Sequence, residues 1–269
     1  MAQKILCITA GQRSGTTALR SLISADQRFK DLGEIFDTSI LDQPQSFFGY
    51  CHKRRLQLAD IMSGPDAERL CKDYVALLQN VAAKSHLLID VKFNSWGEIR
   101  MPWTYMHQEP FFLSQLKWMS ARFIFIWRQD LVGQVLSDRI SDKLGKWHNL
   151  VPDDAIEPFN LDVNKLAARA KLLCQSEQYF YNNLSSYPES LILCYENMFT
   201  AQGGLEGDAS AAVRALVDED LRFPEKGIYH QNLISKASII SNYSEIVSAV
   251  ERVARDYRDP AIARALQRG

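Results

Sequence analysis

The stretch KILCITAGQRSGTTALRSLI, residues 4–23, decides the fold that we expect for this chain. Its first part, ILCIT, is an apolar and β-branched run of strand length, and Gly11 ends it. Leu19, Leu22 and Ile23 then recur at the spacing of a helix, and small hydroxyl residues stand at the helix start. The stretch therefore predicts a buried strand, a turn and the N-terminus of a helix.

The turn in this stretch has the composition of an anion-binding site. At a helix N-terminus, free N–H groups and the positive end of the helix dipole point at the same place. Gly15 lets an anion approach closely, and Arg13 supplies a planar cation. Hydroxyl groups that can donate hydrogen bonds stand at Ser14, Thr16 and Thr17. An ordinary strand-to-helix turn with a solvated arginine is the alternative interpretation.

The loop differs from a Walker A loop, which has four residues between its glycines and a lysine after the second. Only three residues separate Gly11 from Gly15, and Thr16 stands where the lysine would be. The cation, Arg13, instead precedes a Ser-Gly-Thr-Thr run. This order resembles the 5'-phosphosulfate loop of the sulfotransferases that use 3'-phosphoadenosine 5'-phosphosulfate (PAPS), whose usual form is Lys-Ser-Gly-Thr-Thr. The resemblance implies that Arg13 and the amides of Gly15, Thr16 and Thr17 hold the 5'-phosphosulfate.

The whole chain has the composition of a globular protein without a strong overall charge. Its 269 residues, 46% of them hydrophobic, are enough for a single domain over residues 1–269 with a sizeable core. A net charge of -1 and a pI near 6.5 give no general attraction to nucleic acid or to an acidic membrane. Any anion must therefore be held by a local site.

The five cysteines are odd in number and scattered, without CxxC or CxxH spacing. This indicates neither a disulfide framework nor a zinc site. No basic region followed by an apolar segment of signal-peptide length opens the sequence, and no apolar run approaches about 18 residues. We therefore expect a reduced, cytoplasmic protein that does not insert into a membrane and needs no metal.

A second stretch, RFIFIWRQDLVGQVLS at residues 122–137, also predicts a strand followed by a helix. Ligands of open α/β sheets bind beyond the carboxyl ends of the strands, which is where Arg128 would lie. Sulfotransferases hold the 3'-phosphate of PAPS with an arginine at such a strand end and a serine eight or nine positions later. Arg128 and Ser137 match this pattern, and their nine-residue spacing resembles the bacterial sulfotransferases that modify trehalose and rhizobial Nod factor. Two unrelated strand-end turns are the alternative.

Two residues are candidates for the general base. Glu34 follows Gly33 and lies between apolar neighbours, where a carboxylate can have a raised pKa and accept a proton. A capping or surface glutamate is the alternative. The resemblance implies the first, because in the bacterial carbohydrate sulfotransferases a Gly-Glu pair follows the phosphosulfate loop at a similar distance. His52, in the basic run HKRR, is the second candidate or part of a solvated basic patch.

The run LLIDVKF, residues 87–93, predicts another buried strand. Lys92 lines up with a site lysine of the bacterial sulfotransferases, where it would steady the transferring sulfuryl group. A solvated lysine at the strand end is the alternative. Asp90 also fits a Walker B strand, whose aspartate positions Mg²⁺ in an NTPase, although an aspartate near a strand end is common.

Two further stretches resemble the superfamily more weakly. The run LILCYENM, residues 191–198, predicts a buried strand ending in Tyr-Glu, and the resemblance implies that Tyr195 contacts the adenine of the cofactor. The segment KASIISNYSEI, residues 236–246, lies near the place of a cofactor loop, although the glycine-rich RKG form is absent. Lys236 and Ser238 are assigned to the 3'-phosphate on that basis.

The remaining segments are described by their periodicity. Apolar residues at helical spacing predict helices over residues 66–83, 161–184, 209–217 and 242–266. Residues 38–65 are irregular, and their aromatic residues Phe47, Phe48 and Tyr50 either bind the acceptor or pack against the core.

Together these patterns predict an α/β protein with a mostly parallel central sheet flanked by helices. The resemblance implies the P-loop-like sulfotransferase fold and the transfer of a sulfuryl group from PAPS to a hydroxyl acceptor, preferably a carbohydrate or glycoconjugate, leaving adenosine 3',5'-bisphosphate. Glu34 would be the base, and Arg13 and Lys92 would stabilise the transferred group. A nucleotide-dependent kinase or NTPase, and a non-catalytic nucleotide-binding module of the same fold, are the alternatives.

Overall fold

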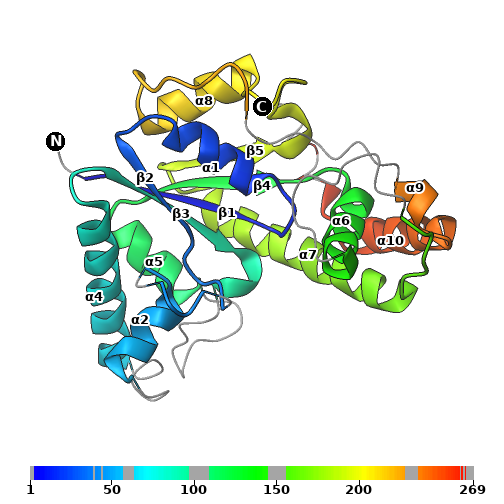
Figure 1. The fold of residues 1–269 in the computed structure, drawn as a ribbon, viewed down its shortest axis with the longest axis horizontal. Helices are drawn as coiled ribbons and strands as arrows, with labels where there is room; N and C mark the ends of the chain where they lie inside the picture. The colour runs from blue at the N-terminus through cyan, green and yellow to red at the C-terminus, as the bar shows by residue number, and fades with distance from the viewer. Residues whose placement is uncertain are drawn as a thin grey trace.

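A sheet of five parallel strands forms the centre of the protein (Figure 1). The computed structural model describes residues 3–38, 40–43, 45–56, 64–96, 109–144, 156–227, 236–260, 262 and 264. The strands lie in the order β2-β3-β1-β4-β5, so β1 is in the middle. Their bounds are β1 Ile5–Ala10, β2 Phe29–Glu34, β3 His86–Lys92, β4 Arg122–Trp127 and β5 Ser190–Cys194.

Helices cover both faces of this sheet. Figure 1 shows α1 and α8 on one face and α2, α4 and α5 on the other. Helix α10 packs against α7 and α6, and α7 contacts β4. The bounds are α1 Thr16–Ser24, α2 Phe47–Arg54, α4 Gly64–Ala82, α5 Phe111–Trp118, α6 Leu131–Leu144, α7 Val163–Leu184, α8 Gly207–Val217, α9 Lys236–Ile239 and α10 Tyr243–Tyr257, with short 3₁₀ turns at Phe93–Ser95 and Tyr195–Asn197.

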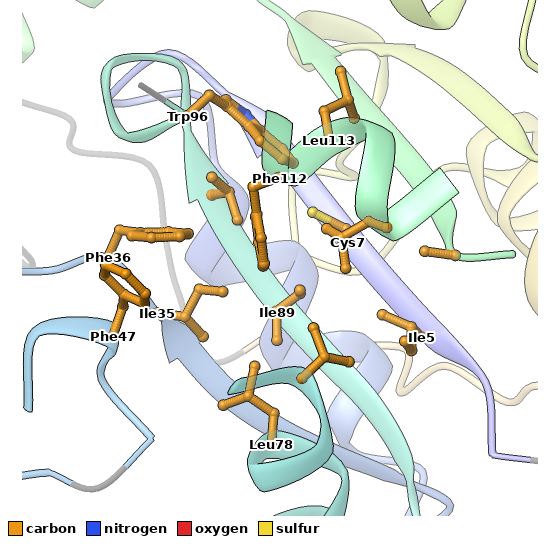
Figure 2. Packing of buried hydrophobic residues seen from close by; sticks show 14 of the residues in the cluster. Ile5, Cys7, Ile35, Phe36, Phe47, Leu78, Ile89, Trp96, Phe112 and Leu113 are labelled. Atoms are coloured by element: carbon orange, nitrogen blue, oxygen red, sulfur yellow. The ribbon is translucent and has the colours of Figure 1, made fainter. Parts of the chain in front are cut away.

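The central strand β1 is buried on both faces because helices cover the sheet on either side. Leu6, Ile8 and Ala10 belong to the cluster that includes residues of α1 and α8. Ile5 and Cys7 point to the opposite face, where Figure 2 shows them among buried residues of β3, α4 and α5. This alternation explains why the strand reads as a continuous apolar run in the sequence.

The predicted class, an α/β protein with a parallel sheet flanked by helices, is confirmed. The four strands expected near residues 5–9, 87–93, 122–127 and 191–198 are present, and the last ends at Cys194, so Tyr195 and Glu196 lie in the turn that follows. Three of the four predicted helices are present with small shifts of their ends. The terminal helix, expected over residues 242–266, ends at Tyr257, and residues 261, 263, 265 and 266 lie outside the described residues.

Two expectations were incomplete. The segment around Glu34 is an edge strand, β2, in which Gly33 has a φ of 74° and the register with β3 shifts between Asp31 and Glu34. The supposedly irregular region contains α2, whose N-cap is Ser46. Phe47 and Tyr50 of this helix are buried in the core, so they serve packing. Within the described ranges, no helix is both long enough and apolar enough to cross a membrane.

Candidate functional site

The loop between β1 and α1 brings a helix N-terminus to the carboxyl edge of the sheet. Helix α1 begins at Thr16, and Gly15 is its N-cap in the left-handed conformation, with a φ of 75°. A Cβ atom at Gly15 would come within 2.7 Å of the Tyr195 ring. Both the positive φ and this close approach therefore favour glycine at the position. The first turn of α1 has no acidic residue, and its N–H groups and dipole therefore make the loop attractive to an anion.

Arg13 joins the two stretches that were predicted to bind phosphate groups. Its Nε donates a hydrogen bond to Oγ of Ser137 at 3.0 Å. Its carbonyl oxygen accepts a hydrogen bond from Nη1 of Arg128 at 2.6 Å. Burial lowers the pKa of Arg13, and the charge of Arg128 acts in the same direction while Asp138 opposes it. The cation assigned to the 5'-phosphosulfate thus contacts the serine assigned to the 3'-phosphate.

Arg128 has hydrogen-bonding capacity that the described part of the protein does not use. Its side chain is only 11% exposed. Its Nε is buried without a hydrogen-bond partner among the described residues. The carboxylates of Asp130 and Glu196 lie 3.7 Å from Nη2 and 3.9 Å from Nε, which is beyond hydrogen-bond distance. A largely buried guanidinium with donors to spare is suited to binding an oxyanion.

Tyr195 and Lys236 lie beside this arginine. The guanidinium of Arg128 lies over the Tyr195 ring, 4.6 Å from its centroid. Nζ of Lys236 donates a hydrogen bond to the carbonyl oxygen of Gly133, near the start of α6, at 2.9 Å. Burial lowers the pKa of Lys236, and so does the charge of Arg128, while Asp130 opposes them. Three cations therefore gather at one edge of the sheet, since Arg13 also acts on Lys236.

Ser238 belongs to the short helix α9 and is exposed. Its assignment to the 3'-phosphate stays a prediction.

Lys92, at the end of β3, lies on the other side of the loop. Its side chain is 5% exposed, so the alternative of a solvated strand-end lysine is wrong. Nζ donates hydrogen bonds to Oγ1 of Thr16 and, at 2.7 Å, to Oδ2 of Asp90. It also forms an ion pair with Oε1 of Glu34 at 3.2 Å. Lys92 therefore connects the start of α1 to the candidate base.

Burial raises the pKa of Glu34, and the charge of Asp90 adds to this effect while Lys92 and Arg20 oppose it. The Glu34 side chain is 31% exposed, so it remains accessible to an acceptor. A carboxylate with a raised pKa beside a fixed cation can accept a proton and then release it. His52, the other candidate base, is exposed in the last turn of α2 beside further basic residues, which fits the solvated patch.

Asp90 is fully buried, and its charge is compensated from two sides. Besides the hydrogen bond from Lys92, its Oδ2 lies 3.5 Å from Nε of Arg20, which also binds Asp31 at 2.8 Å. This arrangement differs from that of a Walker B aspartate, which must present its carboxylate to a metal ion. Both cations contact Oδ2, and Oδ1 of Asp90 is buried without a hydrogen-bond partner among the described residues.

Gln134 is a residue of the site that the sequence did not single out. Its Nε2 donates hydrogen bonds to the carbonyl oxygen of Gln12 at 2.8 Å and to Oγ of Ser14 at 2.9 Å. The buried Ser14 hydroxyl is thus hydrogen-bonded to a side chain of α6. Gln134 lies three positions before Ser137 on α6, and residues three apart lie on the same face of a helix. This spacing is the signal in the sequence that could have placed Gln134 at the site.

Comparisons with known proteins leave the family of this chain open. No family model matches the sequence, and no curated protein matches it. Among solved structures, it is similar to retinol dehydratase in complex with androsterone and the inactive cofactor PAP, with a TM-score of 0.29 and 9% identity over 96% of this chain and 82% of that chain. At that TM-score and identity, the similarity establishes neither the family nor the chemistry of this chain.

Proposed function

We propose that the protein is a PAPS-dependent sulfotransferase, which transfers a sulfuryl group to an acceptor hydroxyl and leaves adenosine 3',5'-bisphosphate. The observation that carries the proposal is the unused hydrogen-bonding capacity of Arg128. This arginine contacts the anion loop through the carbonyl oxygen of Arg13, yet its buried Nε has no hydrogen-bond partner among the described residues. A phosphate at this place would supply the missing acceptor.

The residues present fit a ligand with two separate anionic groups. The N-terminus of α1, with Arg13 and the amides of Gly15, Thr16 and Thr17, would hold the 5'-phosphosulfate. Arg128 and Ser137 would hold the 3'-phosphate, with Lys236 as a further cation and Tyr195 beside the adenine. A nucleotide with only a 5'-phosphate would leave the donors of Arg128 unused, and this supports a 3'-phosphorylated nucleotide.

When bound, PAPS supplies an activated sulfuryl group. The protein then has to position the acceptor hydroxyl, remove its proton and neutralise charge on the leaving side, as in phosphoryl transfer. Glu34 would accept the proton. Because Lys92 contacts Oε1 of Glu34, we assign this role to Oε2. Lys92 and Arg13 would stabilise the charge that develops around the transferred group.

We propose a carbohydrate or glycoconjugate as the acceptor. The support is the order of the Gly33-Glu34 pair after the anion loop and the nine-residue spacing of Arg128 and Ser137, both of which resemble bacterial carbohydrate sulfotransferases. A fold alone does not determine a substrate, so the acceptor has to be tested directly.

The test is turnover of PAPS in the presence of mono- and oligosaccharide acceptors. Release of the bisphosphate measures turnover, and mass spectrometry identifies the sulfated product. We expect acceptor-dependent release that is lost in Glu34→Gln and retained in Glu68→Gln, which changes an exposed glutamate of α4. Turnover of ATP with Mg²⁺ and no turnover of PAPS would contradict the proposal and favour a kinase.

A further inference from the structure

The turn that carries Arg128 is held from two sides by charged side chains. Residues 128–130 connect β4 to α6. The carboxylate of Glu196 accepts hydrogen bonds from the N–H groups of Gln129 and Asp130, both at 2.9 Å. Arg258 donates from Nη1 to the carbonyl oxygen of Gln129 at 2.7 Å and from Nη2 to the carbonyl oxygen of Arg128. A carboxylate thus binds the amides of the turn, and a guanidinium binds its carbonyls.

Arg258 is itself fixed by buried groups. Its Nε and Nη2 bind the carboxylate of Glu177 on α7 at 3.0–3.1 Å, and the side chains of the two residues are 13% and 4% exposed. Its guanidinium also lies over the ring of Trp127, 4.6 Å from the centroid. A planar arginine held by a carboxylate and stacked on an aromatic ring has little freedom to move.

Arg258 does not act on a ligand directly. Its donors are directed to Glu177 and to the two backbone carbonyls, whereas Arg128 has the unused donor. The position of the Arg128 backbone determines where that guanidinium can reach. The end of α10, more than a hundred residues further along the chain, is thereby connected to the anion site.

We propose that Arg258 is a positioning residue for the 3'-phosphate site. By binding the carbonyl oxygens of Arg128 and Gln129, it fixes the strand-end turn and aims the Arg128 guanidinium at the 3'-phosphate. The proposal rests on the proposed function, because it requires a ligand with a phosphate at that place. The loop at residues 11–17 is linked to Arg258 indirectly, through the hydrogen bond from Arg128 to the carbonyl oxygen of Arg13, so binding of a 5'-phosphate should depend on Arg258 much less than binding of a 3'-phosphate.

The experiment compares binding of adenosine 3',5'-bisphosphate and adenosine 5'-monophosphate by calorimetry. The variant is the double substitution Glu177→Met with Arg258→Met, which leaves no unpaired charge behind in the core. We expect the preference of the protein for the bisphosphate to fall about tenfold, since a misplaced guanidinium loses most of its interaction with phosphate. Affinity for the monophosphate should stay within about threefold of the unmodified protein, because that ligand does not reach Arg128.

A matched control is Arg255→Met, which removes an exposed arginine from the same helix. It should leave both affinities unchanged. If the double variant does not fold, Arg258→Lys provides the test, because it keeps a cation beside Glu177 and loses the planar fork that reaches the carboxylate and both carbonyls. This variant should also lose preference for the bisphosphate.

The outcomes separate the two proposals. An unchanged preference in a folded variant would overturn the role of Arg258 and leave the sulfotransferase proposal intact. A loss of affinity for both nucleotides by the same factor would also overturn it, because a merely structural role has that effect. Absence of any preference in the unmodified protein would overturn the proposed function itself, and the role of Arg258 with it.

Discussion

Lys92 and Arg128 are both largely buried cations at the carboxyl edge of the sheet, yet their surroundings are opposite. Lys92 is the last residue of β3 and Arg128 directly follows β4. These two strands flank β1, so the anion loop lies between the two cations. Lys92 is surrounded by acceptors from Thr16, Asp90 and Glu34. Arg128 donates one hydrogen bond, to a carbonyl oxygen, and has a buried Nε without a hydrogen-bond partner among the described residues.

This difference suggests separate roles for the two cations: Lys92 stabilises the protein, and Arg128 is proposed to bind a ligand. The charge of Lys92 is balanced within the protein, so its removal would leave the buried Asp90 carboxylate with Arg20 as its remaining ion-pair partner among the described residues. The carboxylates nearest to Arg128, those of Asp130 and Glu196, lie at the longer distances of 3.7 and 3.9 Å, so removal of Arg128 should affect a ligand more than the fold. Four predictions test this contrast.

The largest effect on stability is expected for Lys92→Met. Asp90 would then keep only Arg20 as a partner for its buried charge, and the free energy of unfolding should fall by about 3 kcal/mol. Urea unfolding measures this change. The control Lys72→Met removes an exposed ion pair on α4 and should cost at most about 0.5 kcal/mol. Equal losses for the two variants would show that Lys92 does not organise the site.

The next effect is expected for Arg128→Met, and it concerns binding. The free energy of unfolding should fall by about 1.5 kcal/mol, half the loss expected for Lys92→Met, since one charge-assisted hydrogen bond to a carbonyl oxygen and the contact with the Tyr195 ring are lost. Affinity for adenosine 3',5'-bisphosphate should fall by about 2 kcal/mol, or roughly 30-fold, because charge-assisted hydrogen bonds to phosphate disappear. A large loss of stability without a change in affinity would reverse the contrast between the two cations.

A smaller effect is expected at Gly15, which lies between them. Alanine there would adopt an unfavourable positive φ and would displace the Tyr195 ring, so Gly15→Ala should cost about 1–2 kcal/mol of stability. Gly207→Ala is the matched control, since a Cβ at Gly207 meets no atom within 4 Å. Thermal unfolding of the two variants measures the difference, and similar melting temperatures would argue against the close contact with Tyr195.

The smallest effect concerns pH. Glu34 must be ionised to accept a proton, so activity should rise with pH through its pKa, which burial and the charge of Asp90 raise. In Asp90→Asn that charge is gone and Lys92 is free to bind Glu34 more closely. Both changes lower the pKa of Glu34, so the acidic limb of the pH-rate profile should move to lower pH. A shift of the acidic limb to higher pH would contradict the inferred effect of the Asp90 charge on Glu34.

The fold could be predicted from the sequence where apolar runs are continuous. Strands β1, β3 and β4 are such runs because helices cover both faces of the sheet. The edge strand β2 could not be predicted, because its sequence FKDLGE mixes charged and apolar residues and contains a glycine with positive φ. Helix α2 was hidden because its aromatic residues and Gly49 have weak helix propensity, and its packing on the core stabilises it.

The site was predictable where residues are neighbours in one motif. The anion loop and the Arg128–Ser137 spacing belong to this kind. The charge compensation of Asp90 could not be predicted from the sequence. It depends on the register that pairs Asp90 with Glu34 across β2 and β3, and on Arg20 from α1. The contacts of Arg258 lie 81 and 130 positions apart in the chain, and only tertiary structure brings those residues together.

The central claim is that this edge of the sheet binds a nucleotide with a 3'-phosphate. Calorimetric titration of the protein with adenosine 3',5'-bisphosphate, adenosine 5'-monophosphate and ATP with Mg²⁺ tests it most directly. We expect the bisphosphate to bind at least about tenfold more tightly than the monophosphate, and the preference to disappear in Arg128→Met. Equal affinity for the bisphosphate and the monophosphate, or preference for ATP with Mg²⁺, would contradict the account.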